Sequence, residues 1–280
     1  MQPSSPTINL LPATLADIPI LATVSHAAFA KDKHTHLKAL LAGYDHGAVM
    51  IEALASWMSR PASKCTVIKA VTSEGEIVGW ACWAFAGFEH HAQSPIPSQS
   101  SPETSSSSAG TKASDQVKKH ESTTEMLPPP PTTTPADVSE RKPAIQRLGQ
   151  LTSLAMSHYA SLLTPPGSKC VILAAINVSP SHQSLGIGSS LITWGTRIAD
   201  TEGVYSWVSS SHDGYRAFEK CGFREVGRLS VVLDDYAEGV ACDLDAEVKG
   251  GEDEEEDGKG KWGEYVWRYM RREVGAVVIA

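Results

Sequence analysis

The stretch from Val171 to Leu191 limits the possible folds of this chain most, because its residue pattern changes from an apolar run to a glycine-containing loop and then to helical spacing. The run from Val171 to Val178 is almost entirely apolar, which is typical of a strand buried on both faces. Pro180 has no N–H to donate, so it ends that strand. A loop with two glycines comes next, and apolar residues then recur at helical spacing at Leu191, Ile192, Trp194 and Ile198. The stretch therefore predicts a strand, a glycine-spaced loop and a helix.

Such a loop favours binding of a phosphate group. Gly186 and Gly188 let the backbone approach a ligand closely, and the unpaired N–H groups and the dipole of the following helix converge there. A dinucleotide-binding oxidoreductase is one alternative. In that motif the first glycine directly follows the strand and a third glycine follows the second, whereas here Gly186 comes well after Val178 and Leu191 occupies the third position. The spacing disfavours this alternative.

The rest of the chain predicts a mixed α/β domain. We expect strands at residues 8–11, 65–71, 77–88, 204–209, 223–233 and 262–271, where β-branched and aromatic residues gather. Helices are expected at residues 14–29, over most of 31–60, at 144–163 and at 214–221. Thr14 and Asp17 form a capping pair for the first helix, and loop 234–261 joins a long final hairpin.

Two segments interrupt this pattern. Of the 42 residues from Ser94 to Pro135, 25 are Ser, Thr or Pro. The segment therefore has too few apolar residues for their burial to offset the entropy lost on ordering it. We therefore expect a disordered insertion at about residues 92–142 and an acidic loop at about 243–260, within a single domain over residues 1–272.

Composition excludes several classes of protein. The formal net charge of −8 disfavours nucleic acid as a partner, although six acidic residues at 252–257 supply most of it. Five scattered cysteines without a CxxC pair predict reduced thiols rather than a disulfide framework or a metal site. We expect no signal peptide and no membrane span, and a cytoplasmic location, with the nucleus as an alternative.

Two motifs together resemble the GNAT superfamily of N-acyltransferases. Gln183-x-x-Gly186-Ile187-Gly188, preceded by Val178 and Pro180, is similar to the acyl-CoA-binding motif of that family. The segment from Ser210 to Phe223, a small-residue stretch and a glycine before a short helix that ends in Gly-Phe, is similar to its second signature. The resemblance implies a mixed sheet with splayed central strands, and it covers about residues 8–88 and 144–272 in element order.

The resemblance also implies the binding residues. Acetyl-CoA would be the co-substrate, and its pantetheine arm would pair with backbone groups between the splayed strands. The implied contacts are Ile176, Val178, Gln183, Ser184, Leu185, Gly186, Ile187, Gly188 and Ser189. Among them, the N–H of Ile176 would be the oxyanion donor, and Gln183 would fix the loop or bond the phosphate. No metal is implied.

The catalytic proton carriers of the family are missing at their usual positions. Many relatives place a Glu or His base on the strand before the loop, where this chain has Ile172, Ala174 and Ala175. A tyrosine usually acts as the general acid in the family, and this chain has Phe218 at that position. Tyr215 and His212 are the nearest candidates for proton transfer. The histidines at 34, 36, 90 and 91 are expected in surface loops.

The sequence thus predicts an N-acetyltransferase that transfers the acetyl group directly to a primary amine of a small molecule or protein. A domain that binds acyl-CoA without turnover, as a sensor or scaffold, is the alternative. The acceptor and the oligomeric state are left open.

Overall fold

The computed structural model describes residues 7–90, 143–244 and 261–276. The expected insertion and nearly all of the acidic loop lie outside these ranges, so the predictions made for them stay predictions. Within the described ranges, no helix combines the length and the apolar character that crossing a membrane requires.

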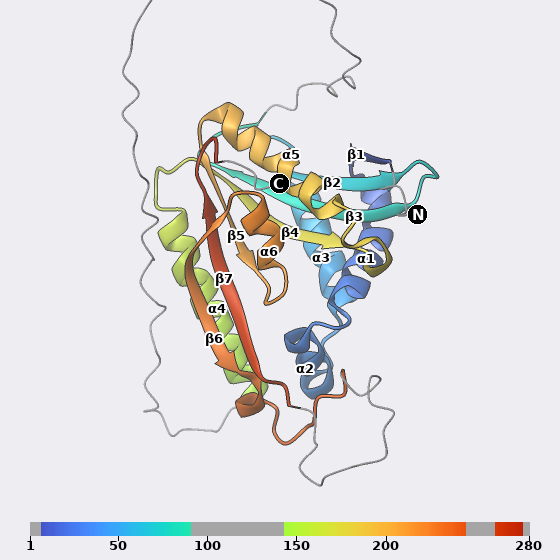
Figure 1. The fold of residues 1–280 in the computed structure, drawn as a ribbon, viewed down its shortest axis with the longest axis vertical. Helices are drawn as coiled ribbons and strands as arrows, with labels where there is room; N and C mark the ends of the chain where they lie inside the picture. Colours follow the sequence, from blue (N-terminus) through green and yellow to red (C-terminus); the bar gives the residue numbers. More distant parts are fainter. Residues whose placement is uncertain (1–6, 91–142, 245–260, 277–280) are drawn as a thin grey trace, which may run out of the picture.

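Seven strands form one mixed sheet in the order β1-β2-β3-β4-β5-β7-β6 (Figure 1). The strands are β1 Ile8–Pro12, β2 Cys65–Thr72, β3 Ile77–Ala86, β4 Cys170–Val178, β5 Tyr205–Ser210, β6 Arg224–Val232 and β7 Glu264–Arg272. The β4–β5 pair is parallel and every other neighbouring pair is antiparallel. The mixed α/β fold class predicted from the sequence is confirmed.

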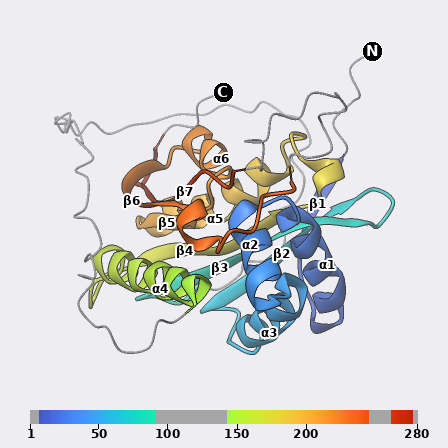
Figure 2. The same cartoon turned by 90° about the horizontal axis from the view of Figure 1, so that it is seen from below.

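Helices cover both faces of this sheet (Figure 2). On one face lie α1 Ile18–Phe29, α2 Lys33–Ala42, α3 His46–Met58 and α4 Ala144–Leu163, and on the other α5 Ile187–Glu202 and α6 Tyr215–Lys220. Short 3₁₀ turns follow β1 at Leu15–Asp17, β4 at Pro180–His182 and β6 at Leu233–Tyr236. Three buried clusters result, formed by α5 with β3–β5, by α4 with β6 and β7, and by α1 and α3 with β2 and β3.

The helix predictions hold, with a local correction at one place. The segment 31–60, predicted to be mostly helical, forms two helices. Helix α2 ends at Gly43, whose φ is 59°, and the side chain of Asp45 caps α3 by accepting from the N–H of Ala48 at 3.0 Å. The predicted Thr14 and Asp17 pair forms, with the N–H of Thr14 donating to Asp17 at 2.7 Å, but it begins a 3₁₀ turn, and α1 starts only at Ile18.

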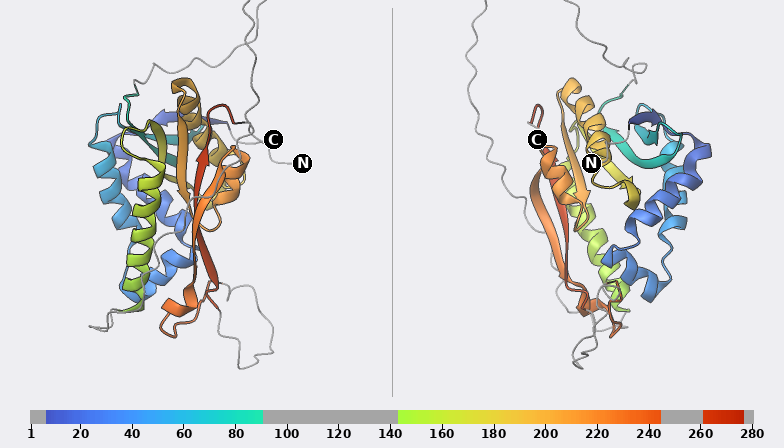
Figure 3. Two further views of the ribbon diagram at one scale, coloured as in Figure 1. Left: turned by 90° about the vertical axis from the view of Figure 1, so that its left-hand side faces the viewer. Right: turned by 45° about the vertical axis from the view of Figure 1, so that its right-hand side comes forward.

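Strands β4 and β5 separate after a short paired region. Their parallel register runs from Cys170 opposite Tyr205 to Leu173 opposite Val208, whereas β4 stays beside β3 as far as Val178. Where β4 and β5 part, the register with β3 shifts, because Cys82 and Trp83 lie opposite Ala175 and Leu173 and leave one extra residue, Ala174, in β4. The second half of β4 therefore has a neighbour on one side only, and the two strands form an open V (Figure 3).

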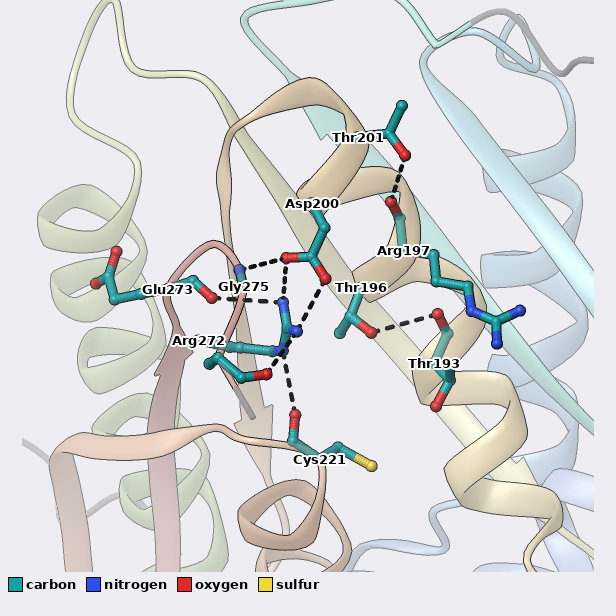
Figure 4. Close-up of polar contacts among 10 residues, drawn as sticks. Thr193, Thr196, Arg197, Asp200, Thr201, Cys221, Arg272, Glu273 and Gly275 are labelled. Carbon is teal, nitrogen blue, oxygen red and sulfur yellow. Dashed lines mark hydrogen bonds and ion pairs between the residues drawn. The ribbon is translucent and has the colours of Figure 1, made fainter. Parts of the chain in front are cut away.

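A buried ion pair fastens the end of β7 to α5 (Figure 4). Arg272, whose side chain is 4% exposed, donates to both carboxylate oxygens of Asp200, at 2.7 and 2.9 Å. The same guanidinium donates to the carbonyls of Cys221 and Ala276, and the N–H of Gly275 donates to Asp200. This arrangement ties together the C-terminal ends of β7, α5 and α6.

Close packing of α5 on the sheet depends on Gly195. A Cβ at this position would lie 2.2 Å from the ring of Trp83, which is fully buried. We therefore expect Gly195→Ala to lower the free energy of unfolding by about 1–3 kcal/mol, as overpacked cores do. The matched control is Gly149→Ala in α4, where a Cβ would meet nothing within 4 Å, and there a gain of about 0.5–1 kcal/mol is expected. Urea unfolding of both variants makes the comparison, and equal changes would contradict the packing argument.

Candidate active site

The glycine-spaced loop places the start of α5 beside the end of β4. Gly186 is the N-cap residue with a φ of 82°, a conformation that favours glycine, and Ser184 also has a positive φ of 62°. The N–H of Ser190 is the first to bond within the helix, to the carbonyl of Gly186 at 3.0 Å. The preceding N–H groups, at 187–189, have no earlier turn to bond to, no side chain caps them, and the first turn carries no acidic residue. This end of α5 is suited to an anion.

Gly188 is not required by the packing of the protein itself. Its φ is ordinary for a helix, and a Cβ there would meet only Val178, at 3.9 Å. A glycine in the first turn of a helix costs stability relative to alanine. Space left open at this position is therefore consistent with close approach of a ligand to the backbone.

Gln183 fixes the loop to the strand. Its side-chain amide donates to the carbonyl of Val178 at 3.1 Å. Of the two functions expected for Gln183, the structure thus shows the contact that holds the loop. The carbonyl of Val178 is engaged by this contact.

The open edge of β4 presents backbone groups to the V. The N–H of Ser179 donates to Val78 at 2.8 Å, so Ser179 and Asn177 direct their backbone groups toward β3. By alternation, Ile176 and Val178 direct theirs toward the side of β5, which has already diverged. Ala174, at the start of this edge, is exposed.

His212 is held by a backbone contact. The N–H of Val266 in β7 donates to its Nδ1 at 3.1 Å. A backbone N–H can only donate, so Nδ1 is the acceptor and the neutral ring carries its proton on Nε2. This tautomer offers a hydrogen-bond donor to the site and disfavours His212 as a base.

Tyr215 lies at the start of α6 among cations. The guanidinium of Arg268 stacks 4.0 Å from its ring centroid, and Arg216 donates to its hydroxyl oxygen at 3.3 Å. The phenolic proton is still available for donation. Phe218 is buried against Phe223 and has no proton to offer.

Helix α2 contains functional-site candidates that the sequence reasoning missed. Asp32, its N-cap, accepts from the hydroxyl of Tyr265 in β7 at 2.6 Å. The ring of His34 packs edge-on against Trp267 with centroids 4.8 Å apart, and His36 contacts Asp243 at 2.6 Å. The expectation that His34 and His36 lie in surface loops is wrong, because they lie in a helix that spans from the α1–α3 side of the sheet to β7. Burial lowers the pKa of His34 to about 4, so it is neutral at pH 7.

A second missed group connects α3 to β4. The hydroxyl of Tyr44 lies 3.2 Å from Nδ1 of His46, and Nε2 of His46 lies 3.0 Å from the hydroxyl of Ser25 in α1. Ser25 in turn donates to the side-chain carbonyl of Asn177 in β4 at 3.1 Å. Ser25 and Asn177 are 0% and 4% exposed. The sequence signal for this group was only the polar Asn177 within an apolar strand.

The hydrogen bond from Ser25 connects the His46 group to the part of β4 that lies beyond its pairing with β5. Asn177 and His212 each lie four residues beyond the last β4–β5 pair, Leu173 opposite Val208, on opposite sides of the opening. In Figure 1, α2 lies across from this opening, below α1 and α3. Within the described ranges, no three His, Cys, Asp or Glu side chains gather closely enough to hold a metal ion. The described residues thus bring together a helix start without a side-chain cap and an open strand edge, with titratable side chains on neighbouring elements.

Comparison with known proteins agrees with this geometry. The model of the acetyltransferase (GNAT) family matches residues 156–223, which contain β4, the glycine loop, α5, β5 and α6. No curated protein matches the sequence.

Two solved structures are similar to this chain, and the one with a TM-score of 0.50 shares its fold. Arylalkylamine N-acetyltransferase 2 from Aedes aegypti is 10% identical with a TM-score of 0.50, over 96% of this chain and 100% of that chain. A structure titled histone acetyltransferase HPA2 and related acetyltransferase, from Corynebacterium glutamicum, is 19% identical with a TM-score of 0.44, over 99% of this chain and 100% of the other. The family match spans both sequence motifs and strands β4 and β5, so the similarity to the GNAT superfamily that the sequence indicated is confirmed over residues 156–223.

Proposed function

We propose that this protein transfers an acetyl group from acetyl-CoA to a primary amine by direct attack on the thioester. The observation that carries the proposal is the adjacency of the open β4 edge and the uncapped start of α5. A pantetheine arm can pair with the N–H of Val178 and the backbone groups of Ile176, while the pyrophosphate reaches the N–H groups at 187–189.

The chemistry follows from the same edge. As the amine attacks, negative charge grows on the thioester oxygen, and the backbone N–H of Ile176 is directed toward that side of the strand. Losing one such donor costs about 2.7–4 kcal/mol of transition-state stabilisation in other enzymes. Tyr215 is the proposed donor to the departing thiolate.

The burial of the cysteines favours direct transfer of the acetyl group to the amine over transfer through an acyl-cysteine. Cys221, the cysteine nearest the second motif, is 2% exposed. Burial raises the pKa of its thiol, which disfavours the nucleophilic thiolate. The other four cysteines are also buried.

A binding protein without turnover is the second candidate. It is favoured by Ala174 and Ala175 on β4 and by the buried Phe218, since none of these side chains carries a titratable proton. Both candidates require acyl-CoA binding, so the two differ only in whether an amine releases CoA.

The first test measures binding. Acetyl-CoA at 100 times its Kd is expected to stabilise the fold by about 2.7 kcal/mol, which raises Tm by roughly 5–11 °C for a protein of this size. No shift with any acyl-CoA contradicts both candidates. Release of CoA above the hydrolysis background is then followed with a panel of alkylamines, arylalkylamines and polyamines. Binding without release for any amine would favour the binding protein.

A further inference from the structure

We propose that His46 is the proton acceptor for the amine, working through the hydroxyl of Tyr44. This inference rests on the proposed acyl transfer and addresses the base that β4 lacks. The hydrogen-bonded chain from Tyr44 through His46 and Ser25 to Asn177 carries it.

Asn177, the member of this hydrogen-bonded series on β4, determines which group donates in each of its hydrogen bonds. The side-chain carbonyl of Asn177 can only accept, so the hydroxyl proton of Ser25 is committed to it. The oxygen of Ser25 must then accept from Nε2 of His46. With its proton on Nε2, the neutral ring has a lone pair on Nδ1, which faces the hydroxyl of Tyr44 at 3.2 Å. Buried partners thus select the tautomer that leaves Nδ1 basic.

In this hydrogen-bonded series a base, His46, is held in place by an orienting group and faces a hydroxyl group that can exchange a proton with it. Ser25 and Asn177 are almost completely buried, so they hold the ring of His46 without titrating themselves. Asn177 lies between Ile176 and Val178, the two residues whose backbone groups line the open edge. Tyr44 is at the other end of the chain and is partly exposed.

Burial, more than the surrounding charges, keeps His46 unprotonated before the reaction. Burial lowers its pKa most, and Lys38 of α2 and His26 of α1 lower it further, whereas Asp32 and Asp45, the N-caps of α2 and α3, raise it. The ammonium of Lys38 lies 3.5 Å from the ring centroid of Tyr44, and the ring of Phe29 packs 4.7 Å from that of His46. Because the net direction is downward, His46 is a free base at pH 7.

The proton balance of the step is complete. The protonated amine first gives one proton to the oxygen of Tyr44, while the proton of Tyr44 passes to Nδ1 of His46. The free amine nitrogen then bonds to the thioester carbon, and the carbon–sulfur bond breaks. The thiolate takes a proton from Tyr215 or water, the second proton lost by the nitrogen replaces that proton, and His46 returns its own proton to solvent.

The test compares His46→Gln and Tyr44→Phe with wild type, using acetyl-CoA and the amine of the panel that releases CoA fastest. Both variants should lower kcat/KM for the amine roughly 100-fold or more at pH 7, the usual contribution of a general base. Tyr44→Phe removes only a hydroxyl, so it tests the relay even if His46→Gln unfolds. In both variants the rate should climb with pH toward the pKa of the amine, because only amine that is already deprotonated reacts. Affinity for acetyl-CoA should not change.

A matched control and a second substrate make the result decisive. His158→Gln alters a histidine of α4 that is not among the groups acting on His46, and it should leave the pH profile unchanged. An amine that is already neutral at pH 7 should lose much less rate in the variants than an ordinary alkylamine does. If both variants keep the wild-type profile while acetyl-CoA still binds and CoA is released, His46 is not the acceptor. If wild type binds no acyl-CoA, the proposed function fails instead.

Discussion

Gly188→Glu is expected to abolish binding of acetyl-CoA while the protein remains folded. Gly188 is the second residue of α5, and the space around its Cβ position is open apart from Val178 at 3.9 Å. A glutamate there places its carboxylate among the N–H groups at 187–189, where it satisfies the helix start and competes with the pyrophosphate. Like-charge repulsion adds to the loss. We expect Kd to rise more than about 100-fold, a change of about 2.7 kcal/mol or more.

Stability and binding should therefore move independently in this variant. A negative charge in the first turn stabilises a helix by about 0.3–1 kcal/mol, so Tm without ligand should stay at or above the wild-type value. Gly149→Glu in α4 is the matched control, because a side chain there meets nothing within 4 Å and lies away from the loop. Isothermal titration with acetyl-CoA measures both variants. Undiminished affinity in Gly188→Glu would remove the start of α5 from the proposed site.

Arg272→Met is expected to produce the largest loss of stability. It leaves the carboxylate of Asp200 and the carbonyl of Cys221 without their guanidinium partner in a region where Arg272 is 4% exposed (Figure 4). Breaking a buried pair in this way typically costs about 3–5 kcal/mol. Asp200 is itself 33% exposed, and solvent screening reduces the expectation to about 2–3 kcal/mol, or roughly 4–12 °C in Tm. Arg228→Met, which breaks an exposed pair with Glu225, should cost less than about 1 kcal/mol.

The pH dependence of the same pair has a definite sign. Burial by itself would raise the pKa of Asp200, but the bonds from Arg272 and the N–H of Gly275 outweigh it and hold the pKa below its usual value. A lowered carboxyl pKa contributes stability above the unfolded value of about 3.9, and this contribution is lost as the pH falls through the folded value. The difference in stability between wild type and Asp200→Asn should thus be constant near neutral pH and shrink below about pH 4. A difference independent of pH down to acid denaturation would show that the carboxylate charge is not what matters.

The local chemistry of the sequence was enough to predict the elements and the glycine-spaced loop that begins α5. The run from Val171 to Val178 had to be a strand, Pro180 had to end it, and the helix at 144–163 followed from its apolar spacing. Gly186 was predicted to let a ligand approach the backbone closely, which stays a prediction, and the structure adds that its φ of 82° favours glycine. These features depend on interactions between near neighbours, which a single sequence displays directly.

The proton-handling groups depended on distant contacts and could not be read in the same way. Ser25 and Asn177 lie 152 residues apart, and Asp32 and Tyr265 lie 233 apart. Nothing in the local sequence distinguishes His46 from an exposed histidine at a helix start, since only the fold brings Ser25 and Tyr44 to its two nitrogens. Likewise the tautomer of His212 follows from an N–H of β7, an element far along the chain.

The sequence by itself therefore determined the family motifs, the glycine-spaced loop at the start of α5 and the lack of a Glu or His side chain on β4. Tertiary structure alone decided where β4 and β5 part, which backbone groups face the opening and which side chains surround it. The physical reason is that backbone conformation responds to neighbouring residues, whereas the tautomer, charge and accessibility of a side chain are set by whatever the fold packs against it.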